Sequence, residues 1–226
     1  MYTKQQVAKT IDHAVLKPEY TDVDLAKHAR MCIENKVFSM CVKPCDIKQA
    51  AALLKGSGVK VSCVLSFPHG DDATPVKAFQ ARQAIADGVE EIDMVMNIGK
   101  FLSGDFEYVV DDIKAVVDVA HAHDIPVKVI QESGFLSLEQ VAKACELSLK
   151  AGADFVKTST GFGPGGAKPE QIDMMVKTVG GKMKVKASGG IRTWDEAIAF
   201  LHQGADRLGV GSTEAVLNGA KAEGSY

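Results

Sequence analysis

Several features of membrane, secreted and nucleic-acid-binding proteins are absent from this sequence of 226 residues. No apolar stretch approaches the roughly 18 residues that a membrane-spanning helix needs. The N-terminal segment, MYTKQQVAKTIDHAVLK, lacks the continuous apolar run of a secretory signal. A formal net charge of −3 gives no general electrostatic reason to expect nucleic acid or an anionic membrane as a partner. We therefore expect a cytoplasmic protein.

Cysteine is scarce, and its spacing argues against a metal or disulfide site. The five cysteines are an odd number and form no Cys-x-x-Cys motif. We interpret them as buried free thiols; they are Cys32, Cys41, Cys45, Cys63 and Cys145. His121 and His123 lie two positions apart, which on a helix directs them to different sides. We expect no metal ion and no other cofactor.

Linkers and low-complexity segments are also absent, so residues 1–226 are expected to form one domain. A content of 46% apolar residues with 21 glycines suits a compact core and many tight loops. At this length a folded chain buries roughly 70% of the surface that its unfolded form exposes, so the core needs no covalent or metal reinforcement.

Short apolar runs alternate with longer amphipathic ones along the chain. The eight short runs are typical of strands, and they read TIDHAVL, VFSMCV, VKVSCVLSF, EEIDMVMNI, IPVKVIQE, ADFVKTST, MKVKASG and ADRLGVG. Helical spacing of apolar residues marks the segments 76–88, 106–123 and 138–152. Residues typical of helix starts and ends flank several such segments; they are Asp22, Asp24, Ser137 and Thr193, and Gly88, Gly152 and Gly204.

The order of these elements predicts an α/β fold. One joint recurs before three of the strands, as a glycine followed by an acidic residue, in GVEEIDM, GADFVKT and GADRLGV. Alternating strands and helices, with strands apolar enough to be covered on both sides, predict a parallel sheet. Eight such units in 226 residues favour a single closed (β/α)8 TIM barrel over an open doubly wound sheet.

Two lysines stand where such a barrel carries its active site, at the carboxyl ends of the strands. Lys157 ends the sixth strand, in ADFVKTSTG, and Lys186 ends the seventh, in KVKASGG. Neighbouring strands lie about 4.8 Å apart, so the two amines could lie close together and lower each other's pKa. A lysine with a lowered pKa can attack a carbonyl and form a Schiff base. The alternative is that one or both lysines are solvated at the rim.

Other charged residues within the strands are further candidates. Asp93 stands among apolar residues in EEIDMVMNIG, where a carboxylate needs a partner. Facing the lysine pair, it would stay ionised and could relay protons through water; otherwise it caps the following loop. We expect two more charged pairs at the same level, Lys128 with Glu132 and Asp12 with His13.

Glycine-rich loops after the seventh and eighth strands indicate an anion site. Gly189 and Gly190 precede a helix that starts near Trp194, and Gly211 and Ser212 precede another. Backbone N–H groups at such positions can hold a phosphate, although glycines in loops are often only turns. The segment 161–166 also matches G-x-G-x-x-G, but its proline and the lack of a ribose-binding acid favour a mobile substrate loop over a dinucleotide site.

Several of these motifs resemble the deoxyribose-phosphate aldolase family. They are ADFVKTSTGF, KASGGIRT and EEIDMVMNIG, with IDHAVLKPE, KVIQES and RLGVGS in the same order over essentially the whole chain. The resemblance implies a reversible class I aldol reaction, in which 2-deoxy-D-ribose 5-phosphate gives glyceraldehyde 3-phosphate and acetaldehyde.

The resemblance also implies roles for individual residues. Lys157 would be the Schiff-base lysine, Lys186 the partner that lowers its pKa, and Asp93 the proton-relay carboxylate. Gly161, Gly189, Gly190, Gly211 and Ser212 would bind the substrate and its phosphate. Asp12, Lys128 and the terminal Tyr226 would be accessory residues, and a homodimer is the assembly that we consider.

Three residues depart from the family pattern near these motifs. Ala14 stands where a threonine is usual, Lys43 where an asparagine is usual, and Gln131 where an apolar residue is usual. They remove a hydroxyl, add a cation and add an amide near the site, which affects the expected substrate more than the mechanism. The alternatives are a lysine aldolase for another phosphorylated sugar and a non-catalytic barrel that binds sugar phosphates.

Overall fold

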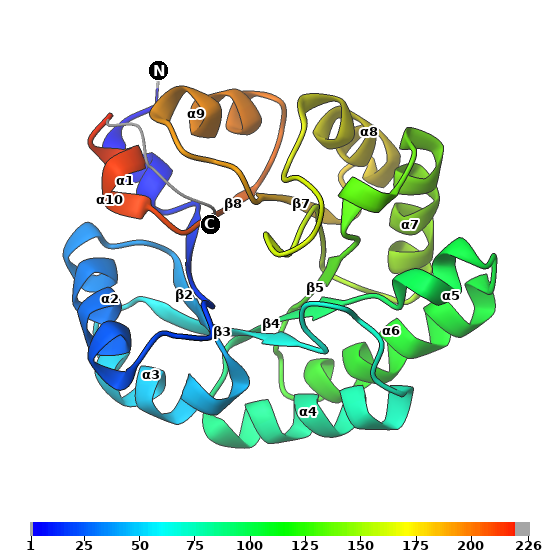
Figure 1. The fold of residues 1–226 in the computed structure, drawn as a ribbon, viewed down its shortest axis with the longest axis horizontal. Coiled ribbons are helices and arrows are strands. Elements are labelled where there is room, and N and C mark those ends of the chain that lie inside the picture. The colour runs from blue at the N-terminus through cyan, green and yellow to red at the C-terminus, as the bar shows by residue number, and fades with distance from the viewer. Residues whose placement is uncertain (1, 220–226) are drawn as a thin grey trace.

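The protein folds into a closed barrel of eight parallel strands surrounded by helices (Figure 1). The structure, a computed structural model, describes residues 2–219. The strands are β1 (Ile11–Val15), β2 (Ser39–Val42), β3 (Lys60–Leu65), β4 (Glu91–Val95), β5 (Val127–Ile130), β6 (Phe155–Lys157), β7 (Lys184–Ser188) and β8 (Arg207–Val210). Each strand pairs with its neighbour in sequence, and β8 pairs with β1. The predicted (β/α)8 barrel and all eight predicted strands are confirmed.

Helices cover the outside of the barrel. They are α1 (Lys4–Ala8), α2 (Asp22–Asn35), α3 (Ile47–Leu54), α4 (Thr74–Asp87), α5 (Ile98–Leu102), α6 (Phe106–His121), α7 (Leu138–Lys150), α8 (Pro169–Val179), α9 (Trp194–His202) and α10 (Thr213–Leu217), with short 3-10 turns at η1 (Pro44–Asp46) and η2 (Ser133–Phe135). The predicted starts at Ser137 and Thr193 are confirmed, because both residues cap their helices with their side chains. Asp22 and Asp24 do not precede α2 but lie in its first turn, and Thr21 is its cap.

The recurring acidic joint has one structural role in all three places. The carboxylates of Glu90, Asp154 and Asp206 each accept a hydrogen bond from a backbone N–H of the preceding strand, at 3.0, 2.8 and 2.9 Å. Each acid therefore satisfies a donor at the edge where the strands begin, and fixes the register of the next strand.

Strand alternation separates an apolar outer layer from a polar barrel interior. Side chains at successive positions point to opposite faces of a strand. On β4, Ile92 and Met94 are fully buried in the main apolar core, whereas Asp93 between them is hydrogen-bonded to lysines of β5, β6 and β7. Burial of each large apolar side chain contributes roughly 1.5–3 kcal/mol, so the layer between strands and helices stabilises a barrel whose interior is charged.

Four of the five cysteines are buried free thiols as predicted, but the prediction for Cys45 is wrong. Cys45 lies in the 3-10 turn after β2, on the surface, because η1 follows Lys43 directly and packs none of its residues into the core. Across residues 2–219, no helix is both long enough and apolar enough to cross a membrane.

A buried ion pair joins α4 to α6 behind the barrel wall. Lys77 and Asp112 are both fully buried, with Nζ 2.6 Å from Oδ2. Lys77 also donates to the carbonyl of Val95, the last residue of β4, at 3.1 Å, and Thr74 donates to Asp112 at 2.8 Å. The pair therefore fixes the end of β4 against two helices.

We predict that Lys77→Met lowers the free energy of unfolding by roughly 3–5 kcal/mol, because it leaves the Asp112 carboxylate buried without its cation. The double variant Lys77→Met/Asp112→Leu should recover part of the loss, as measured by urea denaturation. Lys114→Met is the matched control, since its ion pair with Asp118 is exposed, and it should cost less than about 0.5 kcal/mol. Equal effects in the buried and the exposed pair would contradict the prediction.

Candidate active site

Lys157 and Lys186 lie side by side inside the barrel. They are register partners on β6 and β7, and each is only 1% exposed. Solvation at the rim is thereby excluded for both. Lys157 is the last residue of β6, as predicted, but Lys186 is in the middle of β7 and not at its end. Both amines contact Oδ2 of Asp93, at 2.9 Å from Lys157 and 2.7 Å from Lys186.

Asp93 is the centre of the charged interior and not a cap of the following loop. Its second carboxylate oxygen, Oδ1, accepts from Lys128 Nζ at 2.7 Å, so three lysines share this one carboxylate. Burial opposes ionisation of Asp93, but Lys128, Lys157 and Lys186 together hold its pKa well below its usual range. Asp93 is therefore ionised throughout the physiological pH range.

The network continues toward the end of the barrel where the strands begin. Lys186 contacts Asp12 at 2.5 Å, and Lys128 contacts Glu91 at 2.7 Å. Arg207 binds Asp12 through Nη1 at 2.6 Å and Glu91 through Nη2 at 2.7 and 2.8 Å. Asp12 and Lys128, predicted as accessory residues, thus belong to the same buried network as the catalytic candidates.

The signs of the pKa shifts assign different states to the lysines. Burial lowers the pKa of Lys186, but Asp12 and Asp93 outweigh it and raise that pKa above its ordinary value. The pKa of Lys128 is raised in the same way, mainly by Asp93 and Asp12 against the effect of burial. Lys157 does lower the pKa of Lys186, as predicted, but the net shift is upward because Asp12 and Asp93 contact Lys186 directly.

Charge balance then distinguishes Lys157. Among the described residues this network joins three carboxylates to four cations, namely Asp12, Glu91 and Asp93 with Lys128, Lys157, Lys186 and Arg207. Burial disfavours an excess of charge, and an arginine does not lose its proton. Lys128 and Lys186 are held in the charged form, which leaves Lys157 as the candidate nucleophile among the lysines of this network.

The two expected pairs within β1 and β5 do not form. His13 neighbours Asp12 in sequence but points to the opposite face of β1, where it contacts His28 and Thr213. Glu132 follows the end of β5 and accepts from the N–H and the hydroxyl of Thr160, not from Lys128. Burial raises the pKa of Glu132.

An apolar wall faces the lysines at the mouth of the barrel. Ala14, Leu16, Cys41 and Val64 form a separate buried cluster on β1, β2, β3 and the residue after β1, with Phe67 packed against it. The ring of Phe67 meets Phe162 edge to face, with centroids 5.4 Å apart. Ala14, where the family has threonine, therefore adds to an apolar surface suited to a small aldehyde.

The two glycine loops meet as predicted. A small cavity is lined by Gly189, Gly190, Ile191, Arg192, Gly209, Gly211 and Ser212. Gly189 and Gly190 both have positive φ, 83° and 78°, which turns the backbone sharply at the end of β7. The second helix start is weaker than expected, because α10 has only five residues. The backbone N–H groups of the loops, more than a helix dipole, are therefore the groups that could bind an anion here.

The loop after β6 (161–166) reaches across the mouth of the barrel (Figure 1). A side chain at Gly166 would collide with the carbonyl oxygen of Gly189, so only glycine permits this close approach. Ala167 N–H donates to the carbonyls of Ser188 and Gly189, which attaches the loop to the phosphate cradle. Gly161 thus begins a loop that covers the site.

The other family departures lie outside the charged interior. Lys43 donates to the carbonyls of Lys17 and Tyr20, which fixes the loop before α2. Gln131 donates to Cys145 on α7, so its amide points away from the barrel interior. The Gln131 amide is therefore directed toward α7, and the Lys43 ammonium toward the loop before α2. Tyr226 lies outside the described residues.

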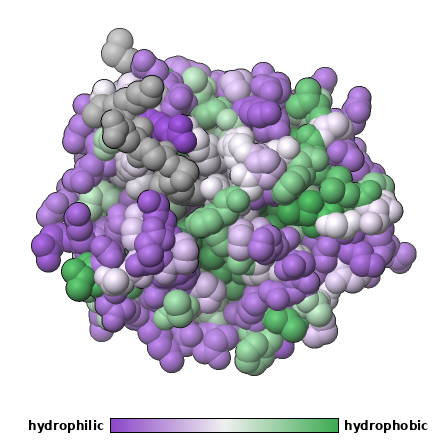
Figure 2. Space-filling view, viewed as in Figure 1, coloured by the Kyte–Doolittle hydropathy of each residue, from purple (hydrophilic) through white to green (hydrophobic). Residues whose placement is uncertain are grey.

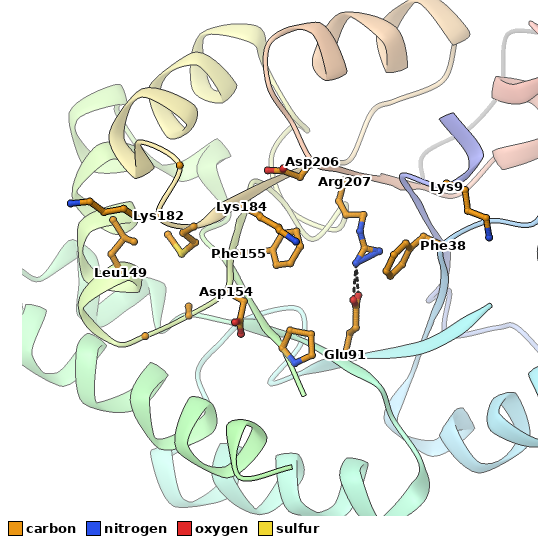
Figure 3. A pocket seen from close by; sticks show the side chains of 15 residues that line it. Lys9, Phe38, Glu91, Leu149, Asp154, Phe155, Lys182, Lys184, Asp206 and Arg207 are labelled. Carbon is orange, nitrogen blue, oxygen red and sulfur yellow. Dashed lines mark hydrogen bonds and ion pairs between the residues drawn. The ribbon is translucent and has the colours of Figure 1, made fainter. Parts of the chain in front are cut away.

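A cavity of about 740 Å³ opens at the opposite end of the barrel (Figure 3). Arg207 lies there with its Cζ 3.2 Å from the centroid of the Phe38 ring and 5.6 Å from that of Phe155. Its guanidinium is occupied by Glu91 and Asp12. These contacts close the end of the barrel where the strands begin, which in such barrels serves stability.

Three residues of the interior were missed by sequence reasoning. Glu91 and Arg207 are charged residues at inward positions of their strands. Side chains two positions apart share a face of a strand, so Glu91 could have been found from Asp93, and Arg207 from Gly209. Ser159 has a buried hydroxyl with no hydrogen-bond partner among the described residues and lies close to Gly189. Within residues 2–219 no group of His, Cys, Asp or Glu side chains is arranged to hold a metal.

Comparison with known proteins agrees with this geometry. A family model described as DeoC/LacD family aldolase matches residues 6–220. A deoxyribose-phosphate aldolase of Clostridium perfringens (strain 13 / Type A) is 49% identical over 223 residues, 99% of each chain. One from Thermococcus gammatolerans is 48% identical over 217 residues, covering 95% of this chain and 96% of that one. The solved deoxyribose phosphate aldolase of Aeropyrum pernix, described as a unique tetramer, has a TM-score of 0.89 at 30% identity and covers 96% of this chain and 91% of that one.

Proposed function

The chain belongs to the DeoC/LacD family of aldolases, and we propose that it cleaves 2-deoxy-D-ribose 5-phosphate reversibly to glyceraldehyde 3-phosphate and acetaldehyde through a Schiff base on Lys157. The substrate follows from relatives that are named deoxyribose-phosphate aldolase and match the whole chain. The observation that carries the mechanism is the pair of contacts from Lys157 and Lys186 to one oxygen of Asp93.

The first chemical step is attack by neutral Lys157 on the aldehyde carbon of the open-chain sugar. A C–N bond forms, the carbonyl oxygen takes up a proton, and its loss as water leaves an iminium. Lys186, kept protonated by two carboxylates, is the acid for this step. Asp93 contacts both amines through Oδ2 and can relay the proton between them.

Carbon–carbon cleavage follows because the iminium accepts electrons. When the C3 hydroxyl gives up its proton, the C2–C3 bond breaks, its electron pair forms an enamine, and glyceraldehyde 3-phosphate leaves. Protonation of the enamine at C2 and addition of water release acetaldehyde and restore the amine. The apolar wall of Ala14, Cys41 and Val64 suits the two-carbon fragment, and the glycine loops hold the phosphate.

We predict that borohydride reduction in the presence of acetaldehyde attaches an ethyl group to Lys157. The amine of Lys157 is buried and able to be neutral, so it should be the site of covalent trapping. Mass mapping of proteolytic peptides measures the position, and Lys157→Ala should abolish the adduct. An adduct on Lys186 or Lys128 in the wild-type chain would show that the roles of the lysines are assigned wrongly.

We predict that Lys186→Leu moves the rising limb of the pH–rate profile to higher pH. Without this cation, the three buried carboxylates favour a protonated Lys157, so its pKa rises and the neutral fraction falls. Activity at pH 7 should drop at least about tenfold, since raising the pKa of Lys157 by about one lowers the neutral fraction by that factor. It should recover in part in alkaline buffer.

Lys184→Leu is the matched control, because Lys184 lies on the same strand but is exposed at the other end of the barrel. It should leave the profile unchanged. A Lys186→Leu profile that keeps its shape and drops only in height would favour obligatory proton donation by Lys186 over the electrostatic role.

A homodimer and a cytoplasmic location complete the proposal. Apolar side chains exposed by 37–53% gather beside α5 and the start of α7, where Figure 2 shows an apolar area; they are Leu102, Phe106, Phe135 and Leu138. Such a surface is typical of protein contacts, and five free thiols suit a reducing compartment.

Sedimentation equilibrium should therefore give twice the chain mass of 24.1 kDa. Leu102→Glu/Phe135→Glu should shift the equilibrium toward monomer, because two charges would be buried in the interface. The control Val23→Glu places a charge on α2, at a residue that is already 78% exposed. A wild-type chain that sediments as a monomer at all concentrations, or a mass that the double variant leaves unchanged, would contradict this assembly.

A further inference from the structure

The two loops of the proposed phosphate cradle are held in place by different means. The β7–α9 loop is fixed by its own helix: Thr193 and Glu196 form a capping box, and Glu196 also accepts from the backbone N–H of Arg192 at 2.7 Å. The β8–α10 loop has no such device. Its cap residue, Ser212, makes no side-chain capping bond, and the helix that follows has only five residues, about one and a half turns.

The β8–α10 loop is instead attached to β1 through buried polar side chains. Thr213, directly after Ser212, is 1% exposed, and its hydroxyl lies 2.9 Å from Nδ1 of His13. The other ring nitrogen of His13, Nε2, lies 2.8 Å from Nδ1 of His28 on α2. His13 pairs in register with Val210, the last residue of β8. A chain of hydrogen bonds thus runs from α2 through β1 to the residue after the cradle.

The protonation state of His13 determines how its two ring nitrogens take part in this chain of hydrogen bonds. Burial, with a smaller contribution from His28, lowers the pKa of His13 to about 3, so the ring is neutral at physiological pH. A neutral imidazole has one donor and one acceptor nitrogen, and both are used here. His28 is half-buried, stacks on Tyr20, and lies near the charged groups Lys17, Asp24, Lys27 and Glu214. It therefore holds the outer end of the chain.

We propose that His13 is a positioning residue for the substrate phosphate, acting through the Thr213 hydroxyl on the backbone of Gly211 and Ser212. The inference rests on the proposed function, since it takes these loops as the phosphate site. His13 points away from the barrel interior and contacts neither Asp93 nor the lysines. Its loss should therefore weaken binding of the phosphate and leave carbon–carbon cleavage unaffected.

The decisive variants are Thr213→Val, which removes the hydroxyl at nearly constant shape, and Thr213→Ser, which restores it. The KM for 2-deoxyribose 5-phosphate should rise about five- to tenfold in Thr213→Val, as expected for one lost hydrogen bond, with kcat within about twofold. With unphosphorylated 2-deoxyribose, kcat/KM should stay within about twofold. Thr213→Ser should return KM close to wild type, and His13→Leu should resemble Thr213→Val.

Thr178→Val is the control, because the Thr178 hydroxyl donates to the Met174 carbonyl within α8, and it should change the KM and kcat for neither sugar. Equal losses with both sugars would show a general structural role and overturn the proposal, as would failure of Thr213→Ser to restore KM.

Inorganic phosphate binding, measured by calorimetry, gives a second readout. It should weaken by a similar factor in Thr213→Val whatever the sugar substrate proves to be, and an unchanged phosphate affinity would also overturn the proposal. A wild-type chain that binds phosphate but cleaves no 2-deoxyribose 5-phosphate would instead refute the proposed function alone.

Discussion

The carboxylate of Asp93, shared by three lysines, is the interaction on which the rest of the site depends. Lys128, Lys157 and Lys186 all place their amines within 2.9 Å of it, at positions with almost no exposure. Three ammonium groups this close in a desolvated interior would repel one another strongly. A central anion makes their convergence possible, and the three lysines in turn hold the pKa of Asp93 well below its usual range.

This constraint distributes the chemistry between the lysines. Asp12 and Asp93 raise the pKa of both Lys128 and Lys186 against the effect of burial, so these two lysines remain charged. In the proposed mechanism Lys186 is then an acid held next to Lys157, the amine that would react. The end of the barrel where the strands begin is closed by Arg207 and Glu91, which shields the network from water on that side. In the proposed mechanism, substrate would therefore approach from the end where Lys157, the apolar wall and the glycine loops meet.

Much of this could be predicted from the sequence because it depends on local pattern. The strands, the caps at Ser137 and Thr193, and the charged residues inside strands all carry signals within a few positions. The contacts between the charged side chains carry no such local signal. Asp12 and His13 are adjacent in sequence but lie on opposite faces of β1, and the raised pKa of Lys186 depends on Asp12, 174 positions away. Neighbours in sequence are a poor guide to partners where strand alternation separates them.

The proposed phosphate cradle likewise combines one loop that is encoded locally with one that depends on a distant residue. The β7–α9 loop is held by Thr193 and Glu196, three residues apart, so its geometry is encoded locally. The β8–α10 loop depends on a residue 200 positions earlier, and nothing near Thr213 reveals that link. In the proposed reaction, one strand, β1, would serve both ends of the substrate: Asp12 on its inner face raises the pKa of Lys186, and His13 on its outer face would hold the loop that receives the phosphate. Because the two side chains are consecutive on a rigid strand, the distance between the reacting amine and the phosphate loop is fixed by the barrel itself.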